Sequence, residues 1–234
     1  CTGCAHDCCY CYAKSMAIRF GRVFPHVWKE EHVRWKDVNK RYRRMDGTVM
    51  FPSSHDITPG NFDACYTVLR KLLEAGNQVL VVSKPHLECI SRICEGMEAH
   101  RDRILFRFTI GAQDDGILSF WEPNAPTYAE RRRALEHAFQ AGFATSVSVE
   151  PMLDSAHIDS LIQDLSPFIT DALWIGKMND IRRRVKIEDE RTREEVSRIE
   201  AGQTDERILE IYRRHKDNPL IKWKESIKKI VDCR

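Results

Sequence analysis

The chain has 234 residues, of which 42% are hydrophobic and 31% charged, and its formal net charge is +2 at pH 7. This composition fits a large globular domain with a substantial core; no apolar run is long enough to span a bilayer, so a membrane partner is not expected. So small a net charge gives no general argument for nucleic acid. Nine cysteines are too few for a disulfide scaffold. Free cysteines and the lack of a signal peptide predict a cytoplasmic protein, and a start at Cys1 rather than Met leads us to expect further residues upstream.

The most informative segment is a cysteine-rich loop at the start of the chain. Cys4, Cys8 and Cys11 are spaced C-x3-C-x2-C, with Tyr10 directly before the last cysteine. Thiolates are the preferred ligands of iron–sulfur iron, and three of them would leave one iron of a cubane cluster open to a further ligand. An alternative stays open, because Cys1 extends the pattern to C-x2-C-x3-C-x2-C, which could hold structural zinc.

Short apolar runs alternate with helical patterns through the next part of the chain. The predicted strands are residues 47–54, 78–83, 104–110, 144–149 and 172–176. The predicted helices are residues 58–75, 87–100, 127–141 and 157–168. Regular alternation of this kind predicts an α/β fold with parallel strands and helical crossovers.

The character of the sequence changes at about residue 182. Residues 182–234 are dense in charges of both signs and have a helical pattern, with a break near Asn218-Pro219. Interspersed charges of this kind usually form a solvated face. The sequence therefore predicts two parts, residues 1–181 and a charged helical extension at residues 182–234.

The cysteine spacing resembles the signature of the radical S-adenosylmethionine (SAM) superfamily. From about residue 2 to residue 153 the chain also resembles its spore photoproduct lyase-like branch. The resemblance implies a partial (β/α)6 TIM-like barrel, in which ligands gather at the carboxyl ends of the strands. Because only five strands are counted, a sixth is expected upstream of residue 1.

The same resemblance implies the cofactors and the reaction. Cys4, Cys8 and Cys11 would ligate a [4Fe–4S] cluster whose open iron is chelated by SAM. One electron from the cluster then cleaves SAM to a 5′-deoxyadenosyl radical, which abstracts a hydrogen atom from a substrate. A reducing partner such as flavodoxin or ferredoxin is implied as well.

The residues that would bind SAM follow the predicted strands. Ser54, His55 and Asp56 come after the first of these strands, where the resemblance implies contacts to the amino group and ribose of SAM. Asp56 suits an ammonium group chemically, although an Asp at this position could also simply form a turn before the next helix.

Further site residues follow the later strands. The resemblance implies that Lys84 meets the SAM carboxylate, that Thr109 bonds its ribose and that Tyr10 lies against the adenine. Glu150 ends the fourth predicted strand and is either a ligand contact or a buried ion-pair partner. For Glu122 we expect a structural role, in which it pairs with an arginine of the next helix.

The substrate is less well defined. Spore photoproduct lyases carry a hydrogen-donor cysteine where this chain has Ser53 and Ser54, so thymine-dimer cleavage is not implied. Trp28, Trp35 and Tyr42 recur every seven residues, which is typical of a helix face packed on a barrel. The same aromatics, with nearby basic residues that include Arg41, Arg43 and Arg44, could instead bind nucleic acid. A nucleic acid or nucleotide, a small metabolite and a peptide all remain candidate substrates.

Overall fold

A computed structural model describes residues 1–232 of the chain. Its centre is a six-stranded sheet in which all neighbouring strands are parallel and follow the order of the chain. The strands are β1 (Thr48–Phe51), β2 (Gln78–Ser83), β3 (Ile104–Thr109), β4 (Ala144–Val149), β5 (Leu173–Ile175) and β6 (Ile221–Trp223). A parallel order without reversal is that of an open barrel wall. The predicted α/β fold class is thus confirmed.

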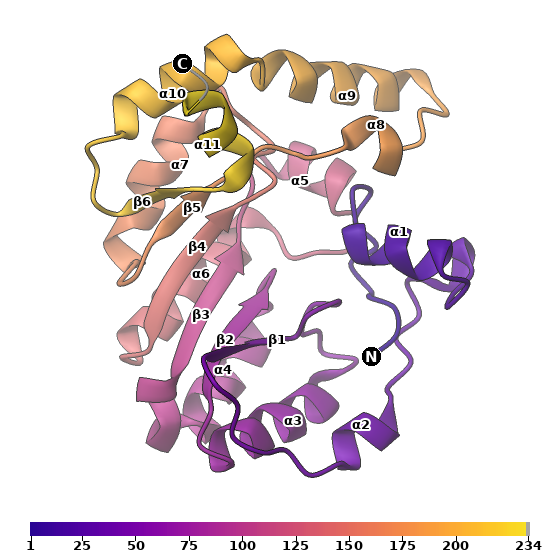
Figure 1. Ribbon diagram of the computed structural model, residues 1–234, viewed down its shortest axis with the longest axis vertical. Coiled ribbons are helices and arrows are strands. Elements are labelled where there is room, and N and C mark those ends of the chain that lie inside the picture. Colours follow the sequence, from indigo (N-terminus) through magenta and orange to yellow (C-terminus); the bar gives the residue numbers. More distant parts are fainter. Residues whose placement is uncertain (233–234) are drawn as a thin grey trace.

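Helices cover one face of this sheet. Figure 1 shows α3 (Phe62–Glu74), α4 (Leu87–Gly96), α6 (Tyr128–Gln140) and α7 (Ile158–Leu165) against that face. These four correspond to the predicted helices. The other helices are α1 (Tyr12–Arg19), α2 (Trp35–Asn39), α5 (Asp115–Trp121), α8 (Ile181–Arg184), α9 (Glu190–Gly202), α10 (Asp205–His215) and α11 (Glu225–Val231), with short 3-10 turns at Pro25–Val27, Glu98–Arg103 and Ser166–Phe168.

The alternation of side chains along the strands explains the two faces of the sheet. In β3, Phe106 and Phe108 are fully buried and pack in the main core beneath the helices. Arg107 and Thr109 alternate with them and are only half-buried on the opposite face. The N-terminal segment with α1 lies beyond the carboxyl ends of the strands (Figure 1). This arrangement brings the cysteine-rich loop to the edge where the polar strand-end residues gather.

The C-terminal segment contributes a strand that the sequence did not predict. After the break at Asn218-Pro219, Ile221–Trp223 forms β6 and pairs with β5. All six strands of the described sheet therefore lie between residues 48 and 223. A strand upstream of residue 1 stays a prediction, as does the division of the chain at residue 182. Within residues 1–232, no helix combines the length and apolar character that crossing a membrane requires.

Candidate functional site

The cysteine-rich loop is fixed by backbone contacts to the segment that follows α1. Thr2 pairs with His32, and the Cys4 N–H donates to the Trp28 carbonyl at 2.8 Å. Gly3 has φ +91°, and a Cβ at this position would lie 2.1 Å from the Glu30 carbonyl oxygen. Only glycine tolerates both the backbone conformation and this close approach.

The three predicted cluster ligands line one cavity of about 260 Å³, which we call the cluster cavity. Cys4 and Cys8 are buried, and Cys11 is half-buried. Cys11 is the N-cap of α1, where its Sγ accepts from the Lys14 N–H at 3.4 Å. Burial raises the pKa of Cys4 to about 12 and the pKa of Cys8 well above its ordinary value. Since metals bind thiolates, loading a metal centre here would release protons.

The predicted SAM-binding residues line the same cavity. Its lining includes nine of the ten residues that the sequence singled out, namely Cys4, Cys8, Tyr10, Cys11, Ser54, His55, Asp56, Lys84 and Thr109. They come from the cysteine-rich loop and from the ends of β1, β2 and β3. Parallel strands explain the convergence, because their carboxyl ends share one edge of the sheet.

Asp56 is the centre of the polar contacts in this cavity. Its Oδ1 accepts from the Lys84 N–H at 2.8 Å and from the Ser83 hydroxyl at 3.2 Å. Its Oδ2 lies 2.8 Å from His6 Nδ1 and 3.2 Å from Lys84 Nζ. Burial alone would raise the pKa of Asp56, but the Lys84 charge and the His6 hydrogen bond hold this pKa well below its usual range. Burial likewise opposes the charge of Lys84, yet Asp56 and its neighbours keep the lysine pKa well above its ordinary value. The cavity therefore contains a carboxylate and an ammonium, both charged.

The hydroxyl of Tyr10, in the cysteine-rich loop, is held by a buried ion pair between Glu122 and Arg131. Its hydroxyl donates to Glu122 Oε1, and Glu122 Oε2 lies 2.5 Å from Arg131 Nη1. The side chains of both charged residues have 0% exposure. The expectation that Glu122 pairs with an arginine of the next helix is thus confirmed. Burial, and then the Glu122 charge, raise the pKa of Tyr10 well above its ordinary value, so its phenol remains a donor.

The geometry does not favour a zinc site. Cys1 lines two other cavities and not the cluster cavity. Within residues 1–232, the ligand atoms of Cys4, His6 and Asp56 lie within 4.8 Å of one another, and no such set unites the three cysteines. Thiolates on one tetrahedral zinc stand only about 3.8 Å apart, given a Zn–S bond of about 2.3 Å. The described residues therefore do not gather the three thiols as closely as one zinc ion would require.

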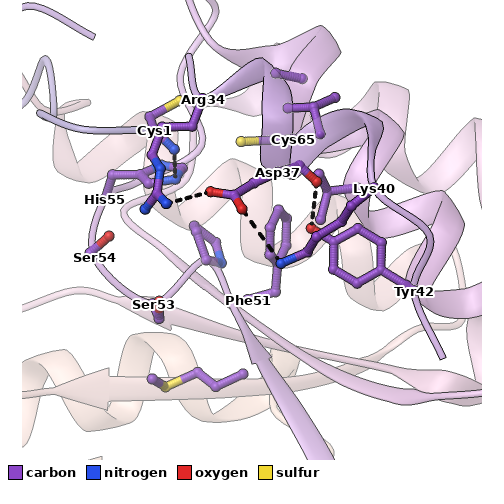
Figure 2. Close-up of a pocket in the computed structure, with 15 residues that line it drawn as sticks. Cys1, Arg34, Asp37, Lys40, Tyr42, Phe51, Ser53, Ser54, His55 and Cys65 are labelled. Atoms are coloured by element: carbon purple, nitrogen blue, oxygen red, sulfur yellow. Dashed lines mark hydrogen bonds and ion pairs between the residues drawn. The ribbon is translucent and has the colours of Figure 1, made fainter. Parts of the chain in front are cut away.

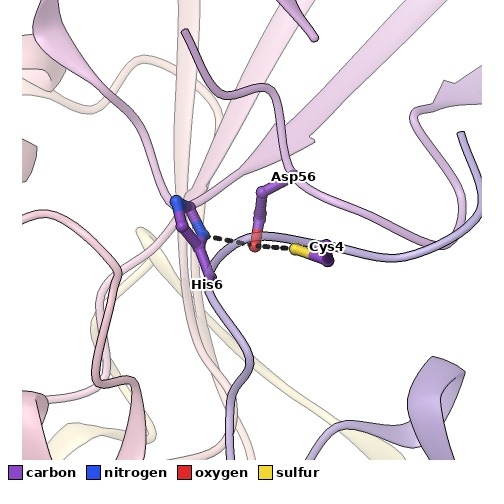
Figure 3. A group of neighbouring side chains, drawn as sticks. All are labelled: Cys4, His6 and Asp56. Carbon is purple, nitrogen blue, oxygen red and sulfur yellow. Dashed lines mark hydrogen bonds and ion pairs between the residues drawn. The ribbon is translucent and has the colours of Figure 1, made fainter. Parts of the chain in front are cut away.

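The set of Cys4, His6 and Asp56 is better described as a hydrogen-bonded network (Figure 3). Cys4 Sγ lies 3.9 Å from Asp56 Oδ2, which also takes the short contact with His6. The Lys84 ammonium lies at 3.2 Å from the same oxygen and neutralises the carboxylate that a metal ion would need. His6 is also bonded through Nε2 to His86 Nε2 at 2.9 Å, so both of its ring nitrogens are occupied.

Glu150 is the one selected residue outside the cluster cavity. Its Oε2 lies 2.9 Å from Nζ of Lys224, which directly follows β6. Gly176 makes room for this contact, because a Cβ there would stand 2.8 Å from Glu150 Oε1. Of the two roles left open for Glu150, the structure shows an ion pair, and that pair is half-exposed.

Three neighbours of the site were not selected from the sequence. His6 and His86 form the network around Asp56, and Tyr12 lines the cluster cavity with Arg184 over its ring at 5.4 Å. The sequence offered two signals for these neighbours: His6 lies between two of the three cysteines, and Tyr12 directly follows the third. The partner Arg184 lies far along the chain and could not be paired with Tyr12 by sequence.

The heptad of aromatic residues does not form one helix face. Trp28 is buried at 2% exposure and lines the cluster cavity, whereas Trp35 is 60% exposed. The helix α2 begins only at Trp35 and spans five residues, Trp35–Asn39, so it includes neither Trp28 nor Tyr42. Tyr42 packs half-buried against the main core, and Arg43 is exposed. The helix-face interpretation was therefore wrong, because seven-residue spacing has meaning only along a continuous helix.

No model of a known protein family matches the chain. One curated relative is the uncharacterized protein ORF301 of Acidianus two-tailed virus, which is 24% identical over 187 residues, or 74% of this chain. The chain spans 62% of the length of that viral protein.

Solved structures of spore photoproduct lyase match almost the whole chain. A mutant with dinucleoside spore photoproduct aligns with a TM-score of 0.57 and 14% identity, over 95% of this chain and 75% of the lyase. A second mutant, with bound AdoMet (SAM) and dinucleoside spore photoproduct, aligns with a TM-score of 0.54 and 16% identity, over 95% of this chain and 74% of the lyase. SuiB of Streptococcus suis aligns with a TM-score of 0.49 and 8% identity, over 76% of this chain and 38% of SuiB. The chain thus has the fold of spore photoproduct lyase, a partial barrel.

Proposed function

We propose that this protein is a radical SAM enzyme in which Cys4, Cys8 and Cys11 hold a [4Fe–4S] cluster. The observation that carries the proposal is the cluster cavity itself, where three thiols share one space with the strand-end residues expected to bind SAM. Among the described residues the three thiols do not form a set within 4.8 Å, and Cys1, the further cysteine of a zinc pattern, does not line the cavity. The residues present therefore fit a cluster of several irons with one iron left unligated by the protein.

The charges of the cavity match the amino-acid part of SAM. SAM has an ammonium and a carboxylate on one carbon, and the cavity offers the Asp56 carboxylate beside the Lys84 ammonium. Each group would exchange part of this ion pair for an opposite charge on the ligand, so neither is left buried and uncompensated. Ser54, His55 and Thr109 line the same cavity and supply donors and acceptors for the ribose.

Reductive cleavage of SAM is the chemistry that the cluster would supply when bound. The protein would orient SAM and shield it from water. His6 and Ser83 fix the two oxygens of Asp56, and the Glu122–Arg131 pair fixes the hydroxyl of Tyr10. The ring of Tyr10, buried at 9% exposure, would then present one face to the adenine and exclude water from it.

The electron donor that we propose is a small acidic redox protein such as flavodoxin or ferredoxin. The surface after the cysteine-rich loop suits such a partner, because Arg19 at the end of α1 and Phe20 and Arg22, which follow it, are all exposed. For the substrate we propose a nucleotide or nucleic acid in preference to a small metabolite or peptide.

The test is anaerobic reconstitution with iron and sulfide, followed by dithionite reduction in the presence of SAM. Chromatography should then detect 5′-deoxyadenosine in the wild-type protein and none in Cys8→Ala. Equal product in Cys8→Ala would contradict the proposed ligand set. Zinc bound without sulfide in the purified protein would contradict the proposal as a whole.

A further inference from the structure

Trp28 is a buried tryptophan whose polar atom has no partner. The residue is 2% exposed. Its indole Nε1 is buried as well, and within residues 1–232 no protein atom accepts a hydrogen bond from it. Buried N–H groups in proteins are almost always bonded to a protein atom, a water molecule or a ligand. The missing partner of Trp28 is therefore to be sought among groups that the chain itself does not supply.

Trp28 lies directly beside the first of the three cluster cysteines. Its carbonyl accepts from the Cys4 N–H at 2.8 Å, and a Cβ on Gly3 would stand 2.7 Å from the same oxygen. The residue also lines the cluster cavity together with Cys4, Cys8 and Cys11. Among the described residues that have a buried side-chain nitrogen or oxygen without a partner, Trp28 is the only one that lines this cavity.

Packing in an apolar core does not account for the burial of Trp28. It belongs neither to the main core nor to the second apolar cluster, which includes Tyr10 and Trp121. The core tryptophan Trp121 does have an acceptor, because its Nε1 donates to Glu195 Oε2 at 3.0 Å. By contrast, Trp28 shares the cavity wall with Ser53 and Ser54 (Figure 2), and neither hydroxyl accepts from the indole.

A cluster would bring suitable acceptors into this cavity. Thiols are weak acceptors, whereas the sulfides of an iron–sulfur cluster and its thiolate ligands carry negative charge and accept N–H donors. Hydrogen bonds to these sulfurs are one of the factors that set the reduction potential of a cluster. Since reduction adds a negative charge, a donor stabilises the reduced form more than the oxidised form and raises the potential.

We propose that the indole N–H of Trp28 donates a hydrogen bond to a sulfur of the cluster centre and thereby raises its reduction potential. This inference rests on the proposed function for the presence of the cluster. Trp28 is then a tuning residue rather than a ligand, and it lets an electron donor reduce the centre more readily. Its burial keeps water from competing for the same hydrogen bond.

The first test is a redox titration of the reconstituted protein without SAM, followed by electron paramagnetic resonance of the reduced cluster. Trp28→Phe removes the N–H and keeps an aromatic ring. It should lower the equilibrium constant for reduction about tenfold, which corresponds to a midpoint potential lower by about 59 mV for a one-electron couple. The matched control is Trp174→Phe, because the buried Nε1 of Trp174 also lacks a partner but Trp174 does not line the cavity. This control should change the constant less than twofold.

A second measurement detects the hydrogen bond itself. With nitrogen-15 in the indole of tryptophan, pulsed electron paramagnetic resonance should show coupling of one nitrogen to the reduced cluster. The coupling should disappear in Trp28→Phe and persist in Trp174→Phe. If Trp28→Phe does not fold, benzothienylalanine at position 28 replaces only the N–H by sulfur and should give the same loss and the same shift in potential.

The outcomes separate this inference from the proposed function. An unchanged potential without any nitrogen coupling would overturn the role of Trp28, as would equal shifts in Trp28→Phe and Trp174→Phe. If the wild-type protein forms a cluster and 5′-deoxyadenosine while Trp28→Phe keeps the wild-type potential, only this inference fails. If the wild-type protein holds no cluster, both proposals fail.

Discussion

The buried ion pair of Glu122 and Arg131, which holds the hydroxyl of Tyr10 in the cysteine-rich loop, gives a prediction with a definite magnitude. Arg131→Met removes a guanidinium of 0% exposure and leaves the equally buried Glu122 carboxylate without its cation. Breaking a buried pair in this way costs about 3–5 kcal/mol of unfolding free energy. For a chain of this length each kcal/mol lowers the melting temperature by roughly 2–4 °C, so we expect a decrease of about 10 °C.

Two further variants make this prediction specific. Glu122→Leu combined with Arg131→Met removes both charges, and the double variant should be about 1–3 kcal/mol more stable than Arg131→Met alone. Arg182→Met breaks the exposed pair with Glu200, which has two contacts of 2.6 Å, and should leave the melting temperature unchanged within error.

The assay is urea unfolding followed by circular dichroism under reducing conditions, with a thermal melt of each variant. The reasoning is refuted if Arg131→Met unfolds at the wild-type midpoint, or if the double variant is no more stable than the single one. A loss in Arg182→Met equal to that in Arg131→Met would also refute it, because burial would then not be the cause.

The remaining predictions concern the cysteine-rich loop and the residues around it. Cys8→Ala should abolish the bound iron and sulfide, whereas Cys9→Ala, whose thiol only donates to a backbone carbonyl at 3.3 Å, should retain both in a metal assay. Asp56→Asn should leave the Lys84 charge uncompensated and lower SAM affinity at least tenfold in equilibrium dialysis; unchanged affinity would exclude Asp56 as a SAM ligand. Gly3→Ala should destabilise the protein by more than about 1 kcal/mol, because it places a Cβ 2.1 Å from a carbonyl oxygen at positive φ; a wild-type melting curve would contradict this.

Local signals predicted the strands and the residues that follow them. A buried parallel strand is a short apolar run, so residues 78–83 could be recognised without tertiary information, and β2 covers the same residues. Asp56, Lys84 and Thr109 were then placed together by one rule, that parallel strands end at a common edge. The structure brings all three to the cluster cavity.

Pairwise contacts across long separations could not be predicted in the same way. Lys224 is 74 positions from Glu150 in the numbering and belongs to a segment expected to be purely helical, yet it forms the ion pair. The three-residue strand β6 has too few positions for a strand pattern to be distinguished from a helical one. The ion pair of Glu122 and Arg131 was the exception and could be predicted. Glu122 caps the end of α5 and Arg131 lies near the start of α6, so only a short loop separates them.

The sequence by itself predicted the three cysteines that line one cavity, the α/β class and the edge of the sheet where that cavity lies, because each depends on spacing or on apolar runs within a few residues. Only the tertiary structure decided which of the basic residues near α2 line a cavity. Arg34, Lys40, Arg43 and Arg44 are equivalent in a sequence read for charge, but Arg34 and Lys40, which flank α2, line one cavity together with His55 (Figure 2), and the other two do not. The reason is that the environment of a charged side chain is set by the packing of segments distant in the sequence, and no local pattern encodes that packing.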